Sequence, residues 1–384
     1  MTLNLILLML GMLLLLPDVY ILLGVIDESS LLTKALFLLP TFAYLGIIVR
    51  IVASDTMRRN DLNTLFWLTL CVPVPLLIFT AVSLLGRVVG LFIEPAATVF
   101  NWAGTIIALT WLAVALYGIT FGWKEVKVRR HKLSFAKLPA EFDGYRIAHL
   151  SDLHLGTYDL APEVVDRIVE KVNALNPDMI VFTGDLINLS PDEAEPYREA
   201  LSRLKAPDGI YSVLGNHDYC IYGLPDSKLT PEHGLSRLIH LQNEMGWNLL
   251  RNEAVEIRRG EDSIAIAGVD NAGGGRFFPD RSDLPAALSE TSDKDFKILL
   301  SHDPSQWRRQ VLPASDIDLT LSGHTHAMQL RVGPFSPASL LYREWAGLYC
   351  DDNRALLVST GTGSSFAFRF GTAPEINFIT LTRP

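Results

Sequence analysis

Charged residues are distributed very unevenly along this chain, and this feature limits what it can fold into more than any other. The first 123 of its 384 residues contain five Lys or Arg and six Asp or Glu, whereas the rest contain 28 and 36. Four segments of the first part are long and apolar enough to cross the roughly 30 Å hydrocarbon core of a bilayer. These segments are residues 3–26, 31–53, 62–86 and 96–122. We therefore predict that residues 1–123 form an all-α membrane bundle of four transmembrane helices.

The basic residues of the short loops predict an orientation, because such loops remain in the cytoplasm. Eight lie on one side of the four predicted spans: Arg50, Arg58, Arg59, Lys124, Lys127, Arg129, Arg130 and Lys132. Only Lys34 and Arg87 lie on the other side. We expect a multi-pass protein of the cell inner membrane, with both termini and the catalytic domain in the cytoplasm. The basic run after Trp123 has two interpretations, a topology signal or a contact with anionic lipid.

The polar part, residues 124–384, alternates short apolar runs with amphipathic segments. Two segments, 162–175 and 193–205, have the pattern of helices. Strands are predicted at 146–150, 178–183, 210–214, 264–268, 296–300, 318–321, 355–359 and 376–381. This order predicts layered sheets flanked by helices.

Composition excludes several classes of protein for this polar part. Its excess of eight acidic residues disfavours nucleic-acid binding, and its apolar content excludes intrinsic disorder. Cys71, Cys220 and Cys350 form no CxxC pair, so we expect neither a disulfide scaffold nor a thiolate metal cluster.

Polar side chains follow five of the predicted strands directly, where an open α/β sheet builds its sites. They occur in the sequences SDLH (151–154), GD (184–185), GNHD (215–218), SHD (301–303) and SGHTH (322–326). In DLH and HTH, a spacing of two lets both side chains face the same way from extended backbone. Asp, Asn and His without Cys favour Mn²⁺, Fe or Zn²⁺ over a soft metal. Seven such ligands are enough for two ions that share a carboxylate.

Together, these five blocks resemble the calcineurin-like metallophosphoesterase superfamily, over about residues 124–384. The resemblance implies a four-layer αββα sandwich with two divalent ions, Mn²⁺ in the first place and Fe or Zn²⁺ as alternatives. It assigns Asp152, His154 and His326 to one ion, Asn216, His302 and His324 to the other, and Asp185 to both. His217 would contact the substrate phosphate and protonate the leaving oxygen, and Asp218 would orient His217. A metal-bridging hydroxide would attack the phosphorus in line.

Further residues resemble a membrane-associated bacterial branch of this superfamily, which includes enzymes that hydrolyse UDP-2,3-diacylglucosamine. That branch commonly has Gly-Gly-Gln where this chain has Ala327-Met328-Gln329, and Ser-Arg-Gly where it has Ser359-Thr360-Gly361. We expect pocket walls from three loops, 219–234, 271–281 and 335–345. The candidate substrate contacts are Tyr219, Tyr222, Arg276 and Arg369.

The predicted function is a membrane-anchored phosphoesterase that hydrolyses a phosphoester or pyrophosphate bond of a lipid-linked or membrane-proximal substrate. An alternative is a tethered phosphatase or phosphodiesterase for soluble nucleotide or protein phosphates. A third possibility, from another class, is a degenerate scaffold or regulatory protein in which the metals only stabilise the fold. The expected partners are the lipid bilayer and the substrate, with no nucleic acid, and the sequence does not define an oligomeric state.

Overall fold

A computed structural model describes residues 3–53, 59–222, 229–273, 278, 280–291 and 294–384, and for residues 3–10, 12–14, 59 and 60 it describes the backbone alone. The described chain divides into two compact units, one up to residue 120 and the other from residue 121 onward.

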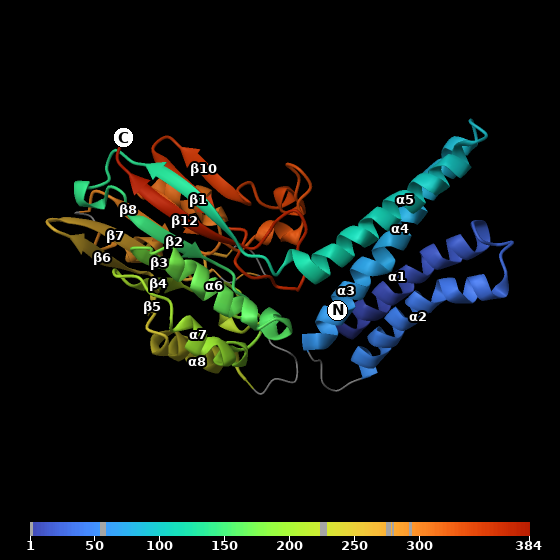
Figure 1. The fold of residues 1–384 in the computed structure, drawn as a ribbon, viewed down its shortest axis with the longest axis horizontal. Helices are drawn as coiled ribbons and strands as arrows, with labels where there is room; N and C mark the ends of the chain where they lie inside the picture. Colours follow the sequence, from blue (N-terminus) through green and yellow to red (C-terminus); the bar gives the residue numbers. More distant parts are fainter. Residues whose placement is uncertain (1–2, 54–58, 223–228, 274–277, 279, 292–293) are drawn as a thin grey trace. The chain divides into compact units, whose positions relative to one another are not determined.

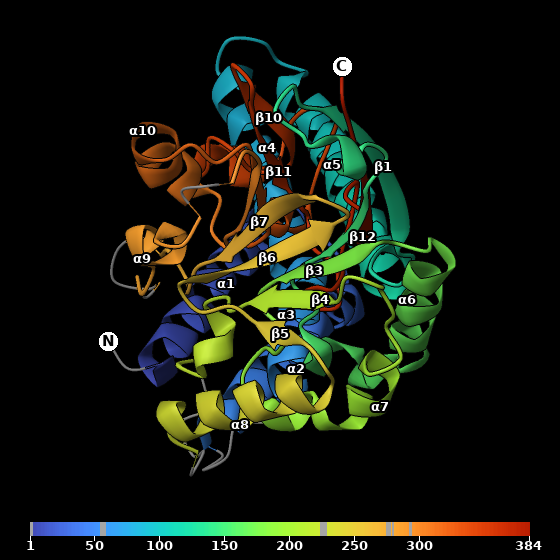
Figure 2. The same cartoon turned by 90° about the vertical axis from the view of Figure 1, so that its left-hand side faces the viewer.

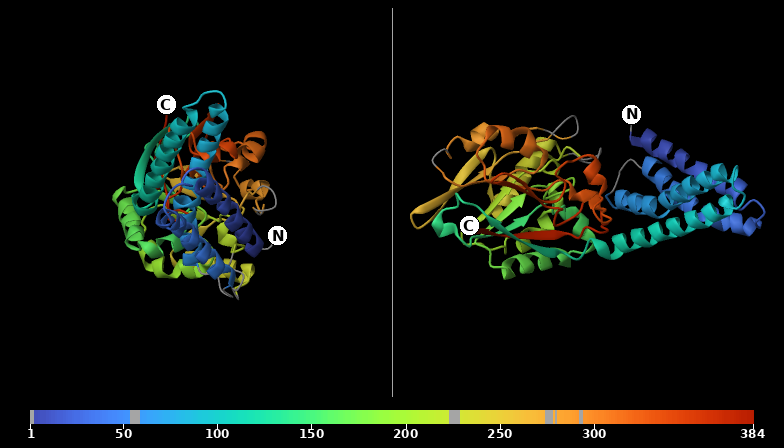
Figure 3. Two further views of the ribbon diagram at one scale, coloured as in Figure 1. Left: turned by 90° about the vertical axis from the view of Figure 1, so that its right-hand side faces the viewer. Right: turned by 90° about the horizontal axis from the view of Figure 1, so that it is seen from above.

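The first unit consists of helices that pack side by side (Figure 3). They are α1 (Leu3–Gly24), α2 (Leu31–Ala53), α3 (Arg59–Cys71), α4 (Pro73–Gly90) and α5 (Ala96–Tyr117), which continues as η1 (Gly118–Gly122). Helices α3 and α4 meet at Val72, where Pro73 begins the second helix as a first-turn proline does.

Within the described residues, three helical stretches are long and apolar enough to cross a membrane: Leu31–Ala53, Asp61–Gly90 and Ala96–Gly122. They coincide with three of the four predicted spans. The remaining predicted span, 3–26, forms α1, but most of its first side chains lie outside the described part and only Leu15–Gly24 counts as a shorter apolar helix. Four spans therefore stay a prediction.

The second unit contains two mixed six-stranded sheets (Figure 1). In spatial order, the first sheet is β1 (Lys127–Ser134), β12 (Glu375–Thr382), β2 (Arg146–Leu150), β3 (Met179–Thr183), β4 (Ile210–Val213) and β5 (Asn248–Leu249). The second is β10 (Gly347–Asp351), β11 (Arg354–Val358), β9 (Leu319–Ser322), β8 (Lys297–Leu300), β7 (Asp262–Gly268) and β6 (Glu253–Arg259). Strands β2 to β5 are parallel in the first sheet, as are β7, β8, β9 and β11 in the second.

One buried apolar cluster joins the two sheets. Ile147 and Val181 of the first sheet belong to the same cluster as Ile266, Leu300 and Leu321 of the second. Helices α9 (Leu284–Leu288) and η7 (Trp307–Val311) contribute to another cluster with β8 and β11, so they cover the other face of the second sheet. Helices α6 (Glu163–Ala174), α7 (Arg198–Leu201) and α8 (Pro231–Glu244) lie beside the first sheet (Figure 2).

Each of the eight predicted strands overlaps an observed strand, with ends that differ by at most two residues. The predicted helix at 193–205 is wrong. The chain there forms two short 3₁₀ turns and the four-residue α7, because Pro196 cannot donate the backbone hydrogen bond that a continuous helix needs. The basic run after Trp123 includes β1, an edge strand that the sequence did not predict, and charged residues on an edge strand protect it from pairing with other chains.

Candidate metal centre

The predicted ligands converge where strands of both sheets end. Asp152 and His154 follow β2, Asp185 follows β3, Asn216 follows β4, His302 follows β8, and His324 and His326 follow β9. The carboxyl ends of parallel strands lie at one edge of a sheet, so this arrangement gathers side chains that are distant in sequence.

At five of the seven predicted ligands the backbone is left-handed, whereas the sequence indicated extended backbone for the DLH and HTH blocks. Positive φ angles occur at Asp152 (53°), His154 (46°), Asp185 (59°), His324 (73°) and His326 (50°). Each strand ends before its ligands, so the chain turns sharply there instead of continuing the pleat. Side chains rarely accept this region without strain, and residues held in it are typical of functional sites.

Two glycines permit the close approach of these turns. A Cβ atom on Gly323 would collide with Ser151 Oγ and with a carboxylate oxygen of Asp152. Gly184 has a φ of +91°, and a Cβ there would collide with the backbone nitrogen of Gly215. Any side chain at either position would displace the neighbouring ligand turn.

The first ligand group consists of Asp152, His154 and His326, all fully or almost fully buried. His326 Nε2 lies 3.2 Å from Asp152 Oδ1 and 3.0 Å from His154 Nε2. Two nitrogens that each bind one metal at about 2.0–2.1 Å lie about 3.0–3.4 Å apart. The separations therefore match those of ligands that share an ion.

The second ligand group consists of Asn216, His302 and His324. His302 Nδ1 donates to the Thr183 carbonyl at 2.6 Å, which leaves Nε2 for a metal, and His324 Nδ1 lies 3.3 Å from that Nε2. Asn216 Oδ1 is buried and has no hydrogen-bond partner, which is the state expected of an oxygen that ligates a cation.

Asp185 lies between the two groups. Its Oδ2 is 3.6 Å from His154 Nε2 and 3.2 Å from His302 Nε2, and its Oδ1 accepts from the His217 backbone N–H at 2.8 Å. This carboxylate therefore has the position that a ligand shared by two ions requires, and the donor set fits the two ions that the sequence predicts.

The electrostatics of the cluster favour cation binding. Although burial opposes ionisation, the nearby histidines, His302 first, keep the pKa of Asp185 well below its ordinary value. Burial likewise opposes charge on His302, but Asp185 raises the pKa of His302 to about 10. Burial, reinforced by repulsion from His154, lowers the pKa of His326 well below its ordinary range, so its lone pair is available. A divalent cation would take the place of the proton held between Asp185 and His302.

His217 lies beside both groups, with its ring edge-on to that of His154 at 4.8 Å between centroids. Its Nδ1 donates to the Asn188 carbonyl at 2.7 Å, so Nε2 is the atom that can exchange a proton with a substrate. Asn188 is a site residue that sequence reasoning missed, because a backbone carbonyl has no sequence signature.

The prediction that Asp218 orients His217 is wrong. The buried Asp218 carboxylate instead accepts from the backbone N–H groups of Asp185 and Leu186, each at 2.8 Å, and of Gly215 at 2.9 Å. Burial first, and Asp185 second, raise the pKa of Asp218 to about 7. Asp218 thus joins the turns that carry Asp185 and Asn216, while the Asn188 carbonyl orients His217.

The four predicted substrate contacts lie in different environments. The Tyr222 ring packs against His217, with centroids 4.7 Å apart, so it lies at the centre. Tyr219 is buried, and its hydroxyl accepts from the Asn271 N–H at 3.2 Å, which directs it away from His217. Arg276 lies outside the described residues.

Arg369 differs from a substrate contact in being fully buried. Its Nη2 donates to the Gly363 carbonyl at 2.6 Å and lies 3.2 Å from His326 Nδ1, while Nε donates to Ser364 Oγ at 2.8 Å. The guanidinium therefore lies behind His326 and stabilises the turn at 360–364. A fully buried guanidinium does not fit the substrate contact that we predicted for Arg369.

Two aromatic residues of the predicted pocket loops reach the second ligand group. The Tyr342 hydroxyl lies 2.9 Å from His324 Nε2, and Phe278 packs edge-on against His324 with centroids 5.0 Å apart. Among the other residues of loop 335–345, Phe335, Leu340 and Leu341 are exposed, the last two by more than 70%. The exposed apolar side chains of this loop therefore lie close in sequence to Tyr342, which is hydrogen-bonded to His324 of the candidate centre.

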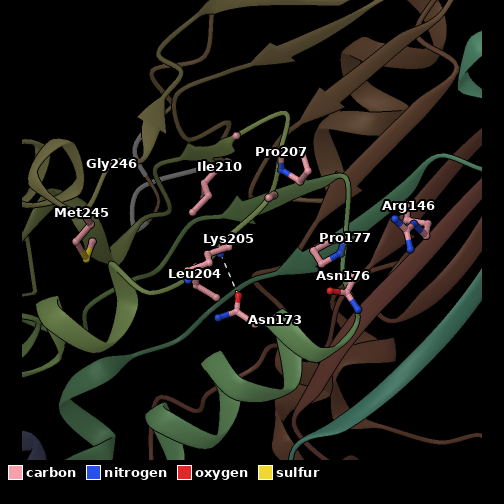
Figure 4. A pocket seen from close by; sticks show the side chains of 12 residues that line it. Arg146, Asn173, Asn176, Pro177, Leu204, Lys205, Pro207, Ile210, Met245 and Gly246 are labelled. Atoms are coloured by element: carbon pink, nitrogen blue, oxygen red, sulfur yellow. Dashed lines mark hydrogen bonds between the residues drawn. The ribbon is translucent and has the colours of Figure 1, made fainter. Parts of the chain in front are cut away.

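A separate cavity of about 720 Å³ lies at the opposite ends of the strands (Figure 4). Its lining includes Arg146 at the start of β2, Pro177 before β3 and Ile210 at the start of β4. None of the predicted ligands lines this cavity, so we do not assign the active site to it despite its size.

Sequence comparisons identify the family of this chain. The sequence model of the calcineurin-like phosphoesterase family matches residues 145–328. A transmembrane protein with metallophosphoesterase domain from Danio rerio is 31% identical over 317 residues, which cover 80% of this chain and 69% of that protein. The uncharacterized metallophosphoesterase YkuE of Bacillus subtilis is 31% identical over 268 residues, covering 67% of this chain and 85% of that protein.

Among solved structures, a dimetal phosphatase from Danio rerio is similar with a TM-score of 0.35 and 12% identity, covering 57% of this chain and 88% of that one. The family match includes the turns that carry Asp152, His154, Asp185, Asn216, His302, His324 and His326. The chain belongs to the calcineurin-like metallophosphoesterase family, as a metal-dependent phosphoesterase with apolar N-terminal helices.

Proposed function

We propose that this protein hydrolyses a phosphoester or pyrophosphate bond with two divalent ions, one held by each ligand group and both by Asp185. The observation that carries the proposal is the convergence of both groups on Asp185, with His217 beside them. Bound divalent ions would neutralise phosphoryl charge and provide hydroxide near neutral pH. Mn²⁺ is the proposed ion, since carboxylate, amide and imidazole ligands suit it, with Fe or Zn²⁺ as alternatives.

His217 would hold the proton that the leaving oxygen needs. Its Nδ1 is bonded to the Asn188 carbonyl, so a proton on Nε2 points away from that bond and can be donated to an alkoxide or phosphate leaving group. Attack in line with the leaving oxygen places the departing group on the side opposite the incoming oxygen, and His217 would define that side.

The proposed substrate is an amphiphile, a lipid-linked or membrane-proximal phosphate compound. Its support is the apolar surface of loop 335–345, defined here as the apolar rim: Phe335, Leu340 and Leu341, with exposures of 51%, 75% and 71%. Exposed apolar side chains in such a group mark a surface for an apolar partner. The same loop bears Tyr342, which is bonded to His324, so the rim is continuous with the candidate centre.

The competing substrate is a soluble nucleotide or protein phosphate, for which the apolar rim would have no role. Turnover of a phospholipid-linked phosphodiester in mixed micelles and of a soluble aryl phosphodiester should be compared for the full-length protein. In Leu340→Ser/Leu341→Ser, we expect KM for the lipid substrate to rise about tenfold or more, since each leucine side chain that the bound lipid would cover is worth up to about 1.5–3 kcal/mol. The soluble ester should show no change.

A matched control places serine at another exposed leucine, Leu348 on β10, which is 43% exposed. Leu348→Ser should leave both substrates unaffected. Equal KM values for the lipid substrate in the wild type and the double variant would contradict the amphiphile proposal. A preference for a nucleotide over every lipid substrate would favour the soluble alternative.

The finer architecture is part of the same proposal. The shared core and the helices beside each sheet support a four-layer αββα sandwich. The distribution of basic residues, eight against two, supports four spans in the inner membrane with the catalytic unit in the cytoplasm.

A further inference from the structure

Two tyrosines outside the five sequence blocks, Tyr222 and Tyr342, are hydrogen-bonded to the second ligand group through their phenol hydroxyls. Asn216 Nδ2 donates to the Tyr222 hydroxyl at 3.2 Å. His324 Nε2 lies 2.9 Å from the Tyr342 hydroxyl. Each tyrosine therefore bonds one polar atom of its partner and leaves the other one, Asn216 Oδ1 or His324 Nδ1, for an ion.

The consequence for Asn216 is a fixed amide orientation. An amide has one donor end and one acceptor end, and the bond to Tyr222 occupies the donor end. Oδ1 is left buried and without a hydrogen-bond partner. This is the atom that an ion would bind, so the phenol determines which end of Asn216 the ion meets.

The consequence for His324 is a fixed ring orientation. Nε2 is hydrogen-bonded to the Tyr342 hydroxyl, and Nδ1, 3.3 Å from His302 Nε2, is the ring atom left for an ion.

Both tyrosines belong to the loops that follow the catalytic blocks, and both contact the same ligand group. Tyr222 follows η6 (His217–Tyr219), and Tyr342 follows η9 (Pro337–Leu340). We propose that Tyr222 and Tyr342 are positioning residues for one of the two metal ions, the one bound by Asn216, His302 and His324. This inference rests on the proposed function, and it predicts that the two ions depend differently on these phenols.

The test is Mn²⁺ binding to the full-length protein, measured by equilibrium dialysis, in two backgrounds that each keep one ligand group. Asp152→Ala retains the second group and His302→Ala retains the first. In the Asp152→Ala background, Tyr222→Phe/Tyr342→Phe should weaken Mn²⁺ binding about 10- to 100-fold, as is usual when the hydrogen-bond partner of a metal ligand is lost. In the His302→Ala background, the same pair should change affinity by less than about threefold.

Tyr145→Phe is the matched control, because it also removes a phenol hydrogen bond, to Asp208 at 2.8 Å, at the opposite end of β2. It should leave both affinities unchanged. In the otherwise wild-type protein, saturating Mn²⁺ should restore the turnover of Tyr222→Phe/Tyr342→Phe, which a folding defect would prevent.

Equal weakening in both backgrounds, or none in either, would overturn the inference. If the wild type binds two Mn²⁺ ions and the tyrosine variants behave like it, the proposed function stands and only the positioning role fails. If the wild type binds no divalent ion, both fail together.

Discussion

At the scale of single residues, the atom that each site side chain presents is determined by the bond made by its other polar atom. His302 presents Nε2 because Nδ1 donates to Thr183, and His217 presents Nε2 because Nδ1 donates to Asn188. Such partners keep a ligand's orientation and basicity suited to its task. The chemistry of the centre therefore depends on groups that no motif contains.

His217 and Asp218 are adjacent but should respond differently to substitution. His217→Asn should lower turnover about 10²- to 10⁴-fold, the usual contribution of a proton donor, with little change in stability. Asp218→Asn places an amide N–H₂ among three backbone donors and should destabilise the fold by about 1–3 kcal/mol for each bond lost. Turnover and urea unfolding of both variants check this contrast, and a stable, inactive Asp218→Asn would contradict it.

The buried side chain of His149 should make the stability of the folded protein depend on pH. It is fully buried on β2, and its Nε2 is 2.8 Å from the Thr183 hydroxyl. Burial, with repulsion from His131, lowers the pKa of His149 to about 3. Between that value and about 6.5 the unfolded chain binds a proton that the folded chain does not, so stability falls as pH falls, by about 1.4 kcal/mol per unit.

In His149→Asn, this component of the acid sensitivity should disappear. Urea unfolding of the full-length protein in detergent, followed by tryptophan fluorescence from pH 7 to pH 4, measures the slope. An unchanged slope in the variant would show that His149 is not the group responsible.

At the scale of elements, the strands and the ligand identities could be predicted from sequence, whereas the loops could not. Continuous apolar runs such as 178–183 indicate buried strands by composition alone. The helix predicted at 193–205 failed because Pro196 interrupts an otherwise amphipathic pattern. The edge strand β1 was missed because its charged residues do not alternate with apolar ones, and the contacts of Asn188 and Tyr342 depend on tertiary structure.

The turn directly after His326 carries backbone strain, because two residues with side chains lie there in left-handed backbone. Ala327 and Met328 have φ angles of 51° and 44°, and Met328 is 47% exposed. Met328→Gly should stabilise the protein by about 1 kcal/mol relative to Met328→Ala, because both alanine and methionine are strained at positive φ. This corresponds to about 2–4 °C in Tm, and equal Tm values for the two variants would refute the strain.

At the scale of the whole molecule, one chain combines an apolar helical unit with a polar metallophosphoesterase unit. Three helical stretches of the described residues are long and apolar enough to cross a membrane. The Danio rerio relative is likewise named a transmembrane protein with a metallophosphoesterase domain. The abrupt change in charge near residue 123 made this division visible in the sequence. The substrate could not be predicted from the sequence, because the choice of substrate depends on loops whose tertiary contacts no motif determines.

The native cysteines allow a test of topology without substitution. Cys350, on β10, is exposed, whereas Cys220 is buried. With the catalytic unit in the cytoplasm, Cys350 should resist an impermeant maleimide in intact cells and react once the cells are lysed. A Cys350→Ser variant identifies the labelled residue, and labelling of Cys350 in intact cells would place the unit on the other side.

The most direct test of the central claim measures bound Mn²⁺ and the hydrolysis of bis(p-nitrophenyl) phosphate on the same samples of wild type and Asp185→Asn. For the wild type, we predict two bound ions per chain and metal-dependent hydrolysis. Because Asp185 lies between the two ligand groups, Asp185→Asn should lose both the bound ions and the hydrolysis. Hydrolysis that survives removal of the metals, or full activity in Asp185→Asn, would contradict the account.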